Sequence, residues 1–175
     1  MASQGTEAKT THTYKDATGA EIEVPSNPKL VVAIQYVGDL LALGVKPQAT
    51  TAYNLKSYPA ELAGVENIGD RPVNREKLLS LQPDLIITDD LDDKSDMEQL
   101  AKVAPTVFLE FWLNEPFTHL HSLAEVLGKQ KEAQAWMDAY NQEVQATKER
   151  IKPYVKDGET ALLLIVSEAA EQMAK

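Results

Sequence analysis

The amino-acid sequence predicts an α/β fold: a three-layer αβα lobe with a mostly parallel sheet, followed by a long helix and the first strand of a missing second lobe. Three observations carry this prediction. Short unbroken apolar runs recur along the chain, as in strands that are buried on both faces. Segments with apolar residues three and four apart, typical of helices, separate these runs. Finally, a helical pattern over residues 129–152 precedes one more apolar run at residues 160–166, and no partner strands follow it.

The stretch VNREKLLSLQPDLIIT, residues 73–88, forms the central α/β unit of the predicted lobe. Its first half predicts a short helix with Asn74 as its N-cap. The apolar face of this helix is predicted to consist of Leu78, Leu79 and Leu81. Pro83 cannot continue a helix, and the apolar run at residues 85–87 predicts a buried strand. Because ligands of open α/β sheets bind beyond the carboxyl ends of the strands, the residues after this strand are candidates for a site.

The other elements follow from the same patterns. A hairpin is expected from residues 12–14 and 21–24 around a turn-rich segment. Buried strands are predicted at residues 30–34, 48–52, 106–109 and 160–166. Helices are predicted at residues 37–43, 57–62, 96–103, 114–127 and 129–152. Glycines that follow two of these helices, Gly44 and Gly128, are typical helix ends. On the longest helix, Trp136 and Tyr140 belong to an apolar stripe and are expected in the core.

The composition argues against several classes of protein. The chain has 175 residues, of which 43% are hydrophobic, enough for the core of one domain. Its formal net charge of −10 argues against a nucleic-acid partner, because phosphate binding needs clustered lysine and arginine. The chain has no cysteine, and its three histidines are not spaced as metal ligands, so direct zinc or manganese capture is not expected. The sequence also lacks the G-x-S-x-G, H-E-x-x-H, P-loop and G-x-G-x-x-G signatures of common enzymes.

Several motifs follow one another along the chain: YKDATGAEIEVPSNPKLVVAI, LLALGVKP, the turn at Gly69 and Asp70, VNREKLLSLQPDLIITDD, KVAPTV and LAEVLGK. Together they resemble the amino-terminal lobe of an iron-siderophore (cobalamin-type, class III) substrate-binding protein of ABC importers. The resemblance implies four parts. These are a disordered tail at residues 1–13, an N-terminal α/β ligand-binding lobe at 14–128, an interlobe helix at 129–152 and the start of a truncated C-terminal lobe at 159–175.

The resemblance implies a binding protein for iron transport and not an enzyme. Such proteins deliver a ferric siderophore or a related chelate to an ABC permease. The iron arrives inside the ligand, so no cofactor is expected. The class is extracytoplasmic, either periplasmic or a cell-surface lipoprotein, and we expect the same of this chain. Without a second lobe, we expect weak ligand binding and a homo-oligomer formed through the unpaired apolar segment at residues 162–166.

Polar and aromatic residues at the predicted strand ends are the candidate ligand-binding residues. They are Gln35, Tyr36, Tyr53, Asn54, Arg71, Asp89, Phe111 and Trp112. Arg71 is the first choice for an anionic ligand group, because its fork of donors suits carboxylate; the alternative is a surface salt bridge to Asp70 or Asp89. Tyr36, Tyr53 and Trp112 suit aromatic walls or, alternatively, partial core. The carboxylates of Asp89 and Asp90 are interpreted as solvated loop groups or helix-end partners rather than iron ligands.

Glu76 has a separate role by resemblance. The motif Asn74-Arg75-Glu76 matches the family pattern in which an outward carboxylate docks on the permease. A first-turn acid that the helix dipole favours is the alternative interpretation, and both can hold together. Two different readings of the whole chain stay open: an isolated flavodoxin-like or receiver-like α/β module, or a self-assembling lobe fragment with no ligand function. A receiver-like module needs clustered carboxylates at more than one strand end, and a flavodoxin-like module needs a turn rich in Gly, Ser or Thr after a strand. The sequence shows acidic residues at one predicted strand end only and no such turn after Ile34.

Overall fold

The structure is a computed structural model that describes residues 10–89, 94–110, 117–156 and 158–160. The chain divides into two compact units, Met1–Met137 and Asp138–Lys175. The strands that the structure describes all lie in the first unit. Helix α6 (Gln130–Ile151) begins in the first unit and ends in the second. In the described part of the chain, no helix is long and apolar enough to cross a membrane.

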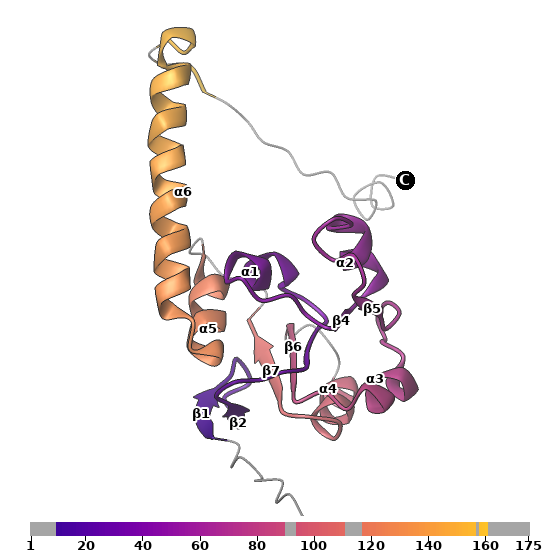
Figure 1. Cartoon of the computed structure of the whole chain (residues 1–175). Helices are drawn as coiled ribbons and strands as arrows, with labels where there is room; N and C mark the ends of the chain where they lie inside the picture. Colours follow the sequence, from indigo (N-terminus) through magenta and orange to yellow (C-terminus); the bar gives the residue numbers. More distant parts are fainter. Residues whose placement is uncertain (1–9, 90–93, 111–116, 157, 161–175) are drawn as a thin grey trace, which may run out of the picture. The chain divides into compact units, whose positions relative to one another are not determined.

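A parallel sheet of five strands forms the middle layer of the first unit (Figure 1). Its strands, in chain order, are β3 (Val31–Ala33), β4 (Ala49–Thr50), β5 (Glu66–Asn67), β6 (Leu85–Asp89) and β7 (Thr106–Leu109). The spatial order is β5-β4-β3-β6-β7, and every neighbouring pair is parallel. The strand order therefore reverses between β3 and β6, which is the switch point where sheets of this type bind ligands. The predicted α/β lobe with a mostly parallel sheet is confirmed.

Alternate residues of the central strands point into two separate cores, as the two-sided burial of a parallel strand requires. Val31, Ala33, Leu85 and Ile87 join one core, whereas Val32, Ile34 and Ile86 join the other. The first core is covered by α1 (Val37–Ala42), α5 (Thr118–Leu127) and the start of α6. The second is covered by α3 (Arg75–Leu81) and α4 (Lys94–Ala101). Helices thus cover both faces of the sheet.

The predicted hairpin also forms, but its first strand begins at Thr11, within the residues 1–13 that were expected to be a disordered tail. Strands β1 (Thr11–Lys15) and β2 (Glu21–Pro25) pair antiparallel in a small sheet of their own. The turn between them reaches the last strand of the main sheet, because the backbone N–H of Ala17 donates to the carbonyl oxygen of Phe108 at 2.8 Å. Val24 of β2 lies in the first core. The hairpin is therefore part of the lobe and is bound to β7 by this backbone hydrogen bond.

Helix α3 follows the predicted pattern with one correction. The side chain of Asn74 accepts a hydrogen bond from the N–H of Lys77 at 3.0 Å, so it is the N-cap. Leu78 is fully buried, but Leu79 is 57% exposed, and its assignment to the apolar face was wrong. The reason is helical geometry: Leu81, three residues after Leu78, packs against the same core, whereas Leu79 lies about 100° round the helix from Leu78. Gln82 leaves the right-handed helical region, with φ 50°, directly before Pro83.

The helix predicted at residues 57–62 is misplaced. The structure has α2 at Ala52–Ser57, directly after β4, and residues 59–64 form turns. Thr51 starts this helix because its side-chain oxygen accepts the N–H of Asn54 at 3.4 Å. Leu55 and Tyr58 then pack against the first core. Tyr53 and Asn54 consequently lie on a helix and not in a loop.

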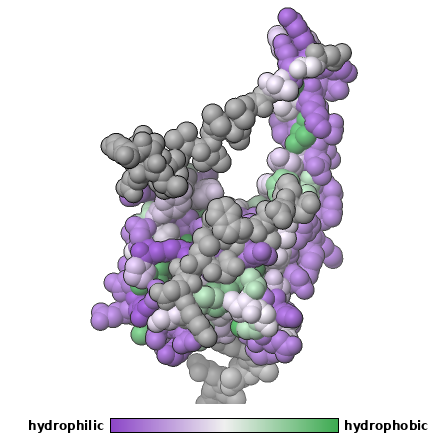
Figure 2. All heavy atoms as spheres, turned by 180° about the vertical axis from the view of Figure 1, so that it is seen from behind, coloured by the Kyte–Doolittle hydropathy of each residue, from purple (hydrophilic) through white to green (hydrophobic). Residues whose placement is uncertain are grey.

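The predicted long helix is confirmed as α6, but its apolar stripe is buried only at the start. Ala133 is buried, and the ring of Trp136 lies 5.6 Å from that of Phe117 and packs on the first core. Tyr140 is exposed, so its predicted place in the core was wrong. Figure 2 shows a column of mostly hydrophilic residues along α6. A short 3₁₀ helix (Lys152–Tyr154) ends it. The predicted strand at residues 160–166 and the second-lobe assignment of residues 159–175 fall almost wholly outside the described residues and stay predictions.

Candidate functional site

Hydrogen bonds link the carboxyl ends of the five parallel strands into one polar edge. The amide of Asn54, after β4, donates to the carbonyl of Ile34, after β3, at 3.1 Å. The N–H of Tyr53 donates to the carboxylate of Asp70, which lies in the loop after β5, at 3.0 Å. Tyr36 reaches from β3 to the end of β7. The ends of all these strands therefore lie at one edge of the sheet, and we call this region the strand-end edge.

An arginine–aspartate pair occupies the centre of the strand-end edge. Nη1 and Nη2 of Arg71 donate to the two carboxylate oxygens of Asp89, each at 2.9 Å, and Nη2 also lies 3.3 Å from the hydroxyl of Thr88. Such two-pronged pairs are the strongest ion pairs of this kind. The Asp89 side chain is 1% exposed and that of Arg71 33%. The interpretation of Asp89 as a solvated loop carboxylate was wrong, because Asp89 is the last residue of the buried strand β6.

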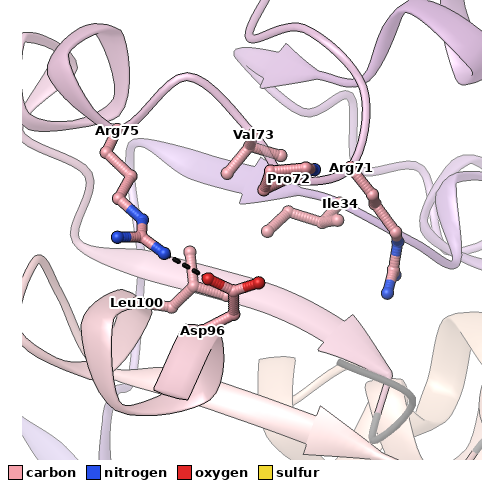
Figure 3. A pocket seen from close by; sticks show the side chains of 7 residues that line it. All are labelled: Ile34, Arg71, Pro72, Val73, Arg75, Asp96 and Leu100. Atoms are coloured by element: carbon pink, nitrogen blue, oxygen red, sulfur yellow. Dashed lines mark hydrogen bonds and ion pairs between the residues drawn. The ribbon is translucent and has the colours of Figure 1, made fainter. Parts of the chain in front are cut away.

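A second arginine lines the same small cavity as the first. Arg71 and Arg75 both line a small cavity of about 20 Å³, together with Ile34, Pro72, Val73, Asp96 and Leu100. Figure 3 shows Arg75 of α3 and Asp96 of α4 pointing toward one another, while the Arg71 side chain lies on the other side of the cavity. Arg75 and Asp96 form an ion pair. Sequence analysis missed this pair, because its members belong to different helices and only the fold brings them together.

Tyr36 is buried, which is the partial-core alternative considered for it. Its hydroxyl lies 3.3 Å from the carbonyl oxygen of Leu109 and 3.4 Å from that of Glu110. Its ring lies 4.6 Å from the ring of His119 on α5. Its backbone adopts φ 62° at the start of α1, which turns the chain sharply at the end of β3. A direct ligand contact by Tyr36 stays a prediction, and its role in this structure is to join the ends of β3 and β7.

Tyr53 and Asn54 are neighbours with opposite exposure. The Asn54 side chain is buried and donates to the Thr50 hydroxyl at 2.9 Å as well as to the carbonyl of Ile34. The Tyr53 side chain is 69% exposed beside Asp70. Tyr53 is thus accessible to a ligand, whereas Asn54 holds α2 against the sheet. Gln35 is half-buried at the same edge, and Phe111 and Trp112 lie outside the described residues.

A half-buried carboxyl that the sequence patterns do not indicate lies next to this edge. Asp39 is in the first turn of α1, and burial raises the pKa of its carboxyl, while the nearby His119 partly opposes the rise. His119 Nε2 lies 2.7 Å from the carbonyl oxygen of Glu110. No short motif could have revealed this group, because Asp39 and His119 are brought together by the packing of α1 on α5.

Two hollows border the last strand. One, of about 210 Å³, is lined by Lys15, Glu110, Thr118 and His119 among others and adjoins the strand-end edge. The other, of about 490 Å³, is mostly apolar and lies between the hairpin and α4. Its lining runs along β7 from Pro105 and Thr106 to Phe108 and does not include Leu109 or Glu110 at the carboxyl end of that strand. The larger hollow is not part of the strand-end edge.

Comparison with known proteins gives the chain several relatives. A model of the periplasmic binding protein family matches residues 31–172. The iron(3+)-hydroxamate-binding protein FhuD of Bacillus subtilis is 33% identical over 151 residues, which are 84% of this chain and 47% of the relative. YhfQ, a putative ABC transporter substrate-binding lipoprotein of the same organism, is 32% identical to this chain. The match covers 73% of this chain and 43% of the length of YhfQ. Unliganded FhuD2 from Staphylococcus aureus superposes with a TM-score of 0.73 at 28% identity, covering 82% of this chain and 53% of that one. The chain thus spans about half the length of the curated relatives it matches.

Proposed function

Because the chain belongs to the periplasmic binding protein family, we propose that it binds a ferric siderophore for delivery to an ABC importer. The relatives support this reading: FhuD is an iron(3+)-hydroxamate-binding protein, and YhfQ is a putative ABC transporter substrate-binding lipoprotein. A place outside the cytoplasm follows from the same likeness. The chain acts by binding and not by catalysis.

One observation carries the proposal. Groups at the carboxyl ends of all five strands meet at the strand-end edge: side chains that follow β3, β4 and β5, the carboxylate of Asp89 in β6, and a backbone carbonyl oxygen of β7. The edge offers an exposed aromatic ring at Tyr53 and half-buried amide groups at Gln35. A siderophore encloses its iron in its own oxygen atoms, so the protein has to supply only walls, donors and charge complementarity. An open edge of this kind fits a bulky chelate better than a bare metal ion.

A titration of the chain with the uncharged ferric trihydroxamate ferrioxamine E tests this proposal. We expect saturable binding that weakens about tenfold in Tyr53→Ala, because a stacked aromatic ring contributes roughly 1–2 kcal/mol through burial and contact. Leu79→Ala is the control, since Leu79 is another exposed apolar side chain of the first unit but does not belong to the strand-end edge. Its affinity should equal that of the wild type. Absence of binding by the wild type, or equal losses in the two variants, would overturn the proposal.

Glu76 is the residue that we propose for docking on the permease. It is exposed in the first turn of α3, at the end of that helix nearest the strand-end edge. Replacement by alanine should lower delivery to the cognate importer and leave ligand affinity unchanged. Glu125→Ala, which removes an exposed carboxylate from α5, is the control and should lower neither. Loss of ligand affinity in Glu76→Ala would contradict a docking role.

Self-association through residues 162–166 stays a prediction, because these residues lie outside those that the structure describes. Sedimentation velocity over a range of concentrations tests it. We expect the weight-average mass to rise with concentration. Replacement of Leu163 by lysine should shift the protein toward monomer. A concentration-independent monomer would refute the prediction without affecting the proposed ligand.

A further inference from the structure

The charges at the strand-end edge are almost fully neutralised. Arg71 is held by the buried carboxylate of Asp89 through two hydrogen bonds of 2.9 Å. The pair as a whole carries no net charge. A ligand anion could use Arg71 only by competing with a carboxylate that burial keeps in place. Arg71 is therefore a poor anchor for an anionic ligand, although its position first suggested that role.

The other positively charged side chains at or next to this edge also lie close to negatively charged ones. Arg75 is paired with Asp96, and Lys15 lines the same hollow as Glu110. Asp70 adds an exposed carboxylate that accepts a hydrogen bond from the backbone of α2. Within the described residues of the edge, each cation has an acidic neighbour, and Asp70 brings a further negative charge. The local field therefore favours a cation over an anion.

We propose that Asp89 determines the charge of the ligand that this lobe accepts: by neutralising Arg71 it makes the edge favour uncharged or cationic ferric chelates over anionic ones. This inference rests on the proposed function and specifies its ligand class. A ferric trihydroxamate is uncharged, because its hydroxamates balance the iron, and a pendant amine makes it cationic. Ferric tris-catecholates and ferric citrate complexes are anionic. Asp89 acts through Arg71, so it is a specificity-determining residue that need not touch the ligand.

A series of chelates that differ only in charge tests the proposal. Ferrioxamine B carries a pendant ammonium group, its N-acetyl derivative carries no charge there, and its N-succinyl derivative carries a carboxylate. All three present the same iron centre. We expect the wild-type chain to bind them in that order, with about a tenfold difference in affinity between the cationic and the anionic member. The cationic and anionic members differ by two units of charge, and a tenfold difference between them is what one unit charge about 10 Å away produces at an effective dielectric constant of about 50, a value suited to a site open to water.

Asp89→Asn removes the negative charge while keeping the size of the side chain and an acceptor for Arg71. The ratio of cationic to anionic affinity should fall about tenfold, because the guanidinium charge is then unmasked. Glu61→Gln is the matched control, since it removes the same charge from an exposed position in the turn that precedes β5. The control separates the local pair from the acidity of the whole chain, and its ratio should equal that of the wild type.

The outcomes separate this inference from the proposed function. If none of the three chelates binds to the wild type, the proposed function fails and the inference fails with it. If all three bind with equal affinity, or the anionic member binds best, the function stands and the inference is refuted. An unchanged ratio in Asp89→Asn, with a circular dichroism spectrum like that of the wild type, also refutes it. Should that variant not fold, the wild-type order still decides.

Discussion

Replacement of Arg71 by methionine should destabilise the chain markedly. The change removes the guanidinium from a carboxylate that is 1% exposed, while the aliphatic stem is largely kept. Breaking a fully buried pair costs about 3–5 kcal/mol. Because the Arg71 side chain is itself 33% exposed, water can reach the site, and we expect a loss of about 2 kcal/mol. For a chain of this size, that corresponds to a fall in Tm of roughly 6 °C.

Urea denaturation followed by circular dichroism measures this loss, and a double-mutant cycle assigns it to the pair. Asp89→Asn alone should cost about 1 kcal/mol, since an uncovered guanidinium can turn to water. Adding Asp89→Asn to Arg71→Met should recover part of the stability, because no buried charge then remains. An Arg71→Met variant as stable as the wild type would refute the reasoning, for it would mean that Asp89 is hydrated and gains little from its partner.

Three further predictions concern the fold and its pH dependence. Leu78→Ala should lower the free energy of unfolding by about 3 kcal/mol. Leu79→Ala, next to it but exposed, should stay within about 0.5 kcal/mol of the wild type. Equal losses of stability in urea denaturation would contradict the orientation of α3 described above. Gly69→Ala should cost roughly 1 kcal/mol, because Gly69 has φ 86° in the loop that carries Arg71, and an unchanged urea midpoint would argue against that conformation. The pKa of the Asp39 carboxyl is raised in the folded state, so its protonated form favours folding. The contribution of Asp39 to the free energy of unfolding should therefore fall as the pH rises from about 3.8 through the raised pKa. The difference in that free energy between wild type and Asp39→Asn should change in this pH window and not elsewhere.

The sheet could be predicted from sequence because its strands are buried on both faces. Runs such as residues 85–87 have no polar position, and only a parallel strand between two helical layers gives every residue an apolar neighbour. Strand β5 was not predicted, since Glu66 and Asn67 are polar and exposed at the end of the sheet. Its pairing depends on backbone hydrogen bonds, such as that from Ile68 N–H to the carbonyl of Thr50 at 3.0 Å, and these leave no trace in side-chain patterns.

The candidate site could be located from sequence, but its charges could not be paired. Strand ends are visible as the points where apolar runs stop, so Gln35 and Asp89 were placed at the carboxyl ends of their strands, whereas Arg71 was selected in a turn. Local pattern cannot tell a buried aspartate from a solvated one, because burial depends on a partner 18 residues away in sequence. For the same reason Tyr36, whose hydroxyl partners lie more than 70 residues away, could not be assigned to the core.

Paramagnetic broadening in NMR spectra tests the central claim most directly, namely that a ferric chelate binds at the strand-end edge. Ferrioxamine E bound through this edge should broaden the amide signals of Gln35, Tyr53 and Asp70, and its diamagnetic gallium analogue should leave them sharp. Lys29 and Lys46, which precede β3 and β4 at the other end of the sheet, should keep their intensity in both cases. Broadening centred on Lys29 and Lys46, with the signals of Gln35, Tyr53 and Asp70 unaffected, would contradict the account.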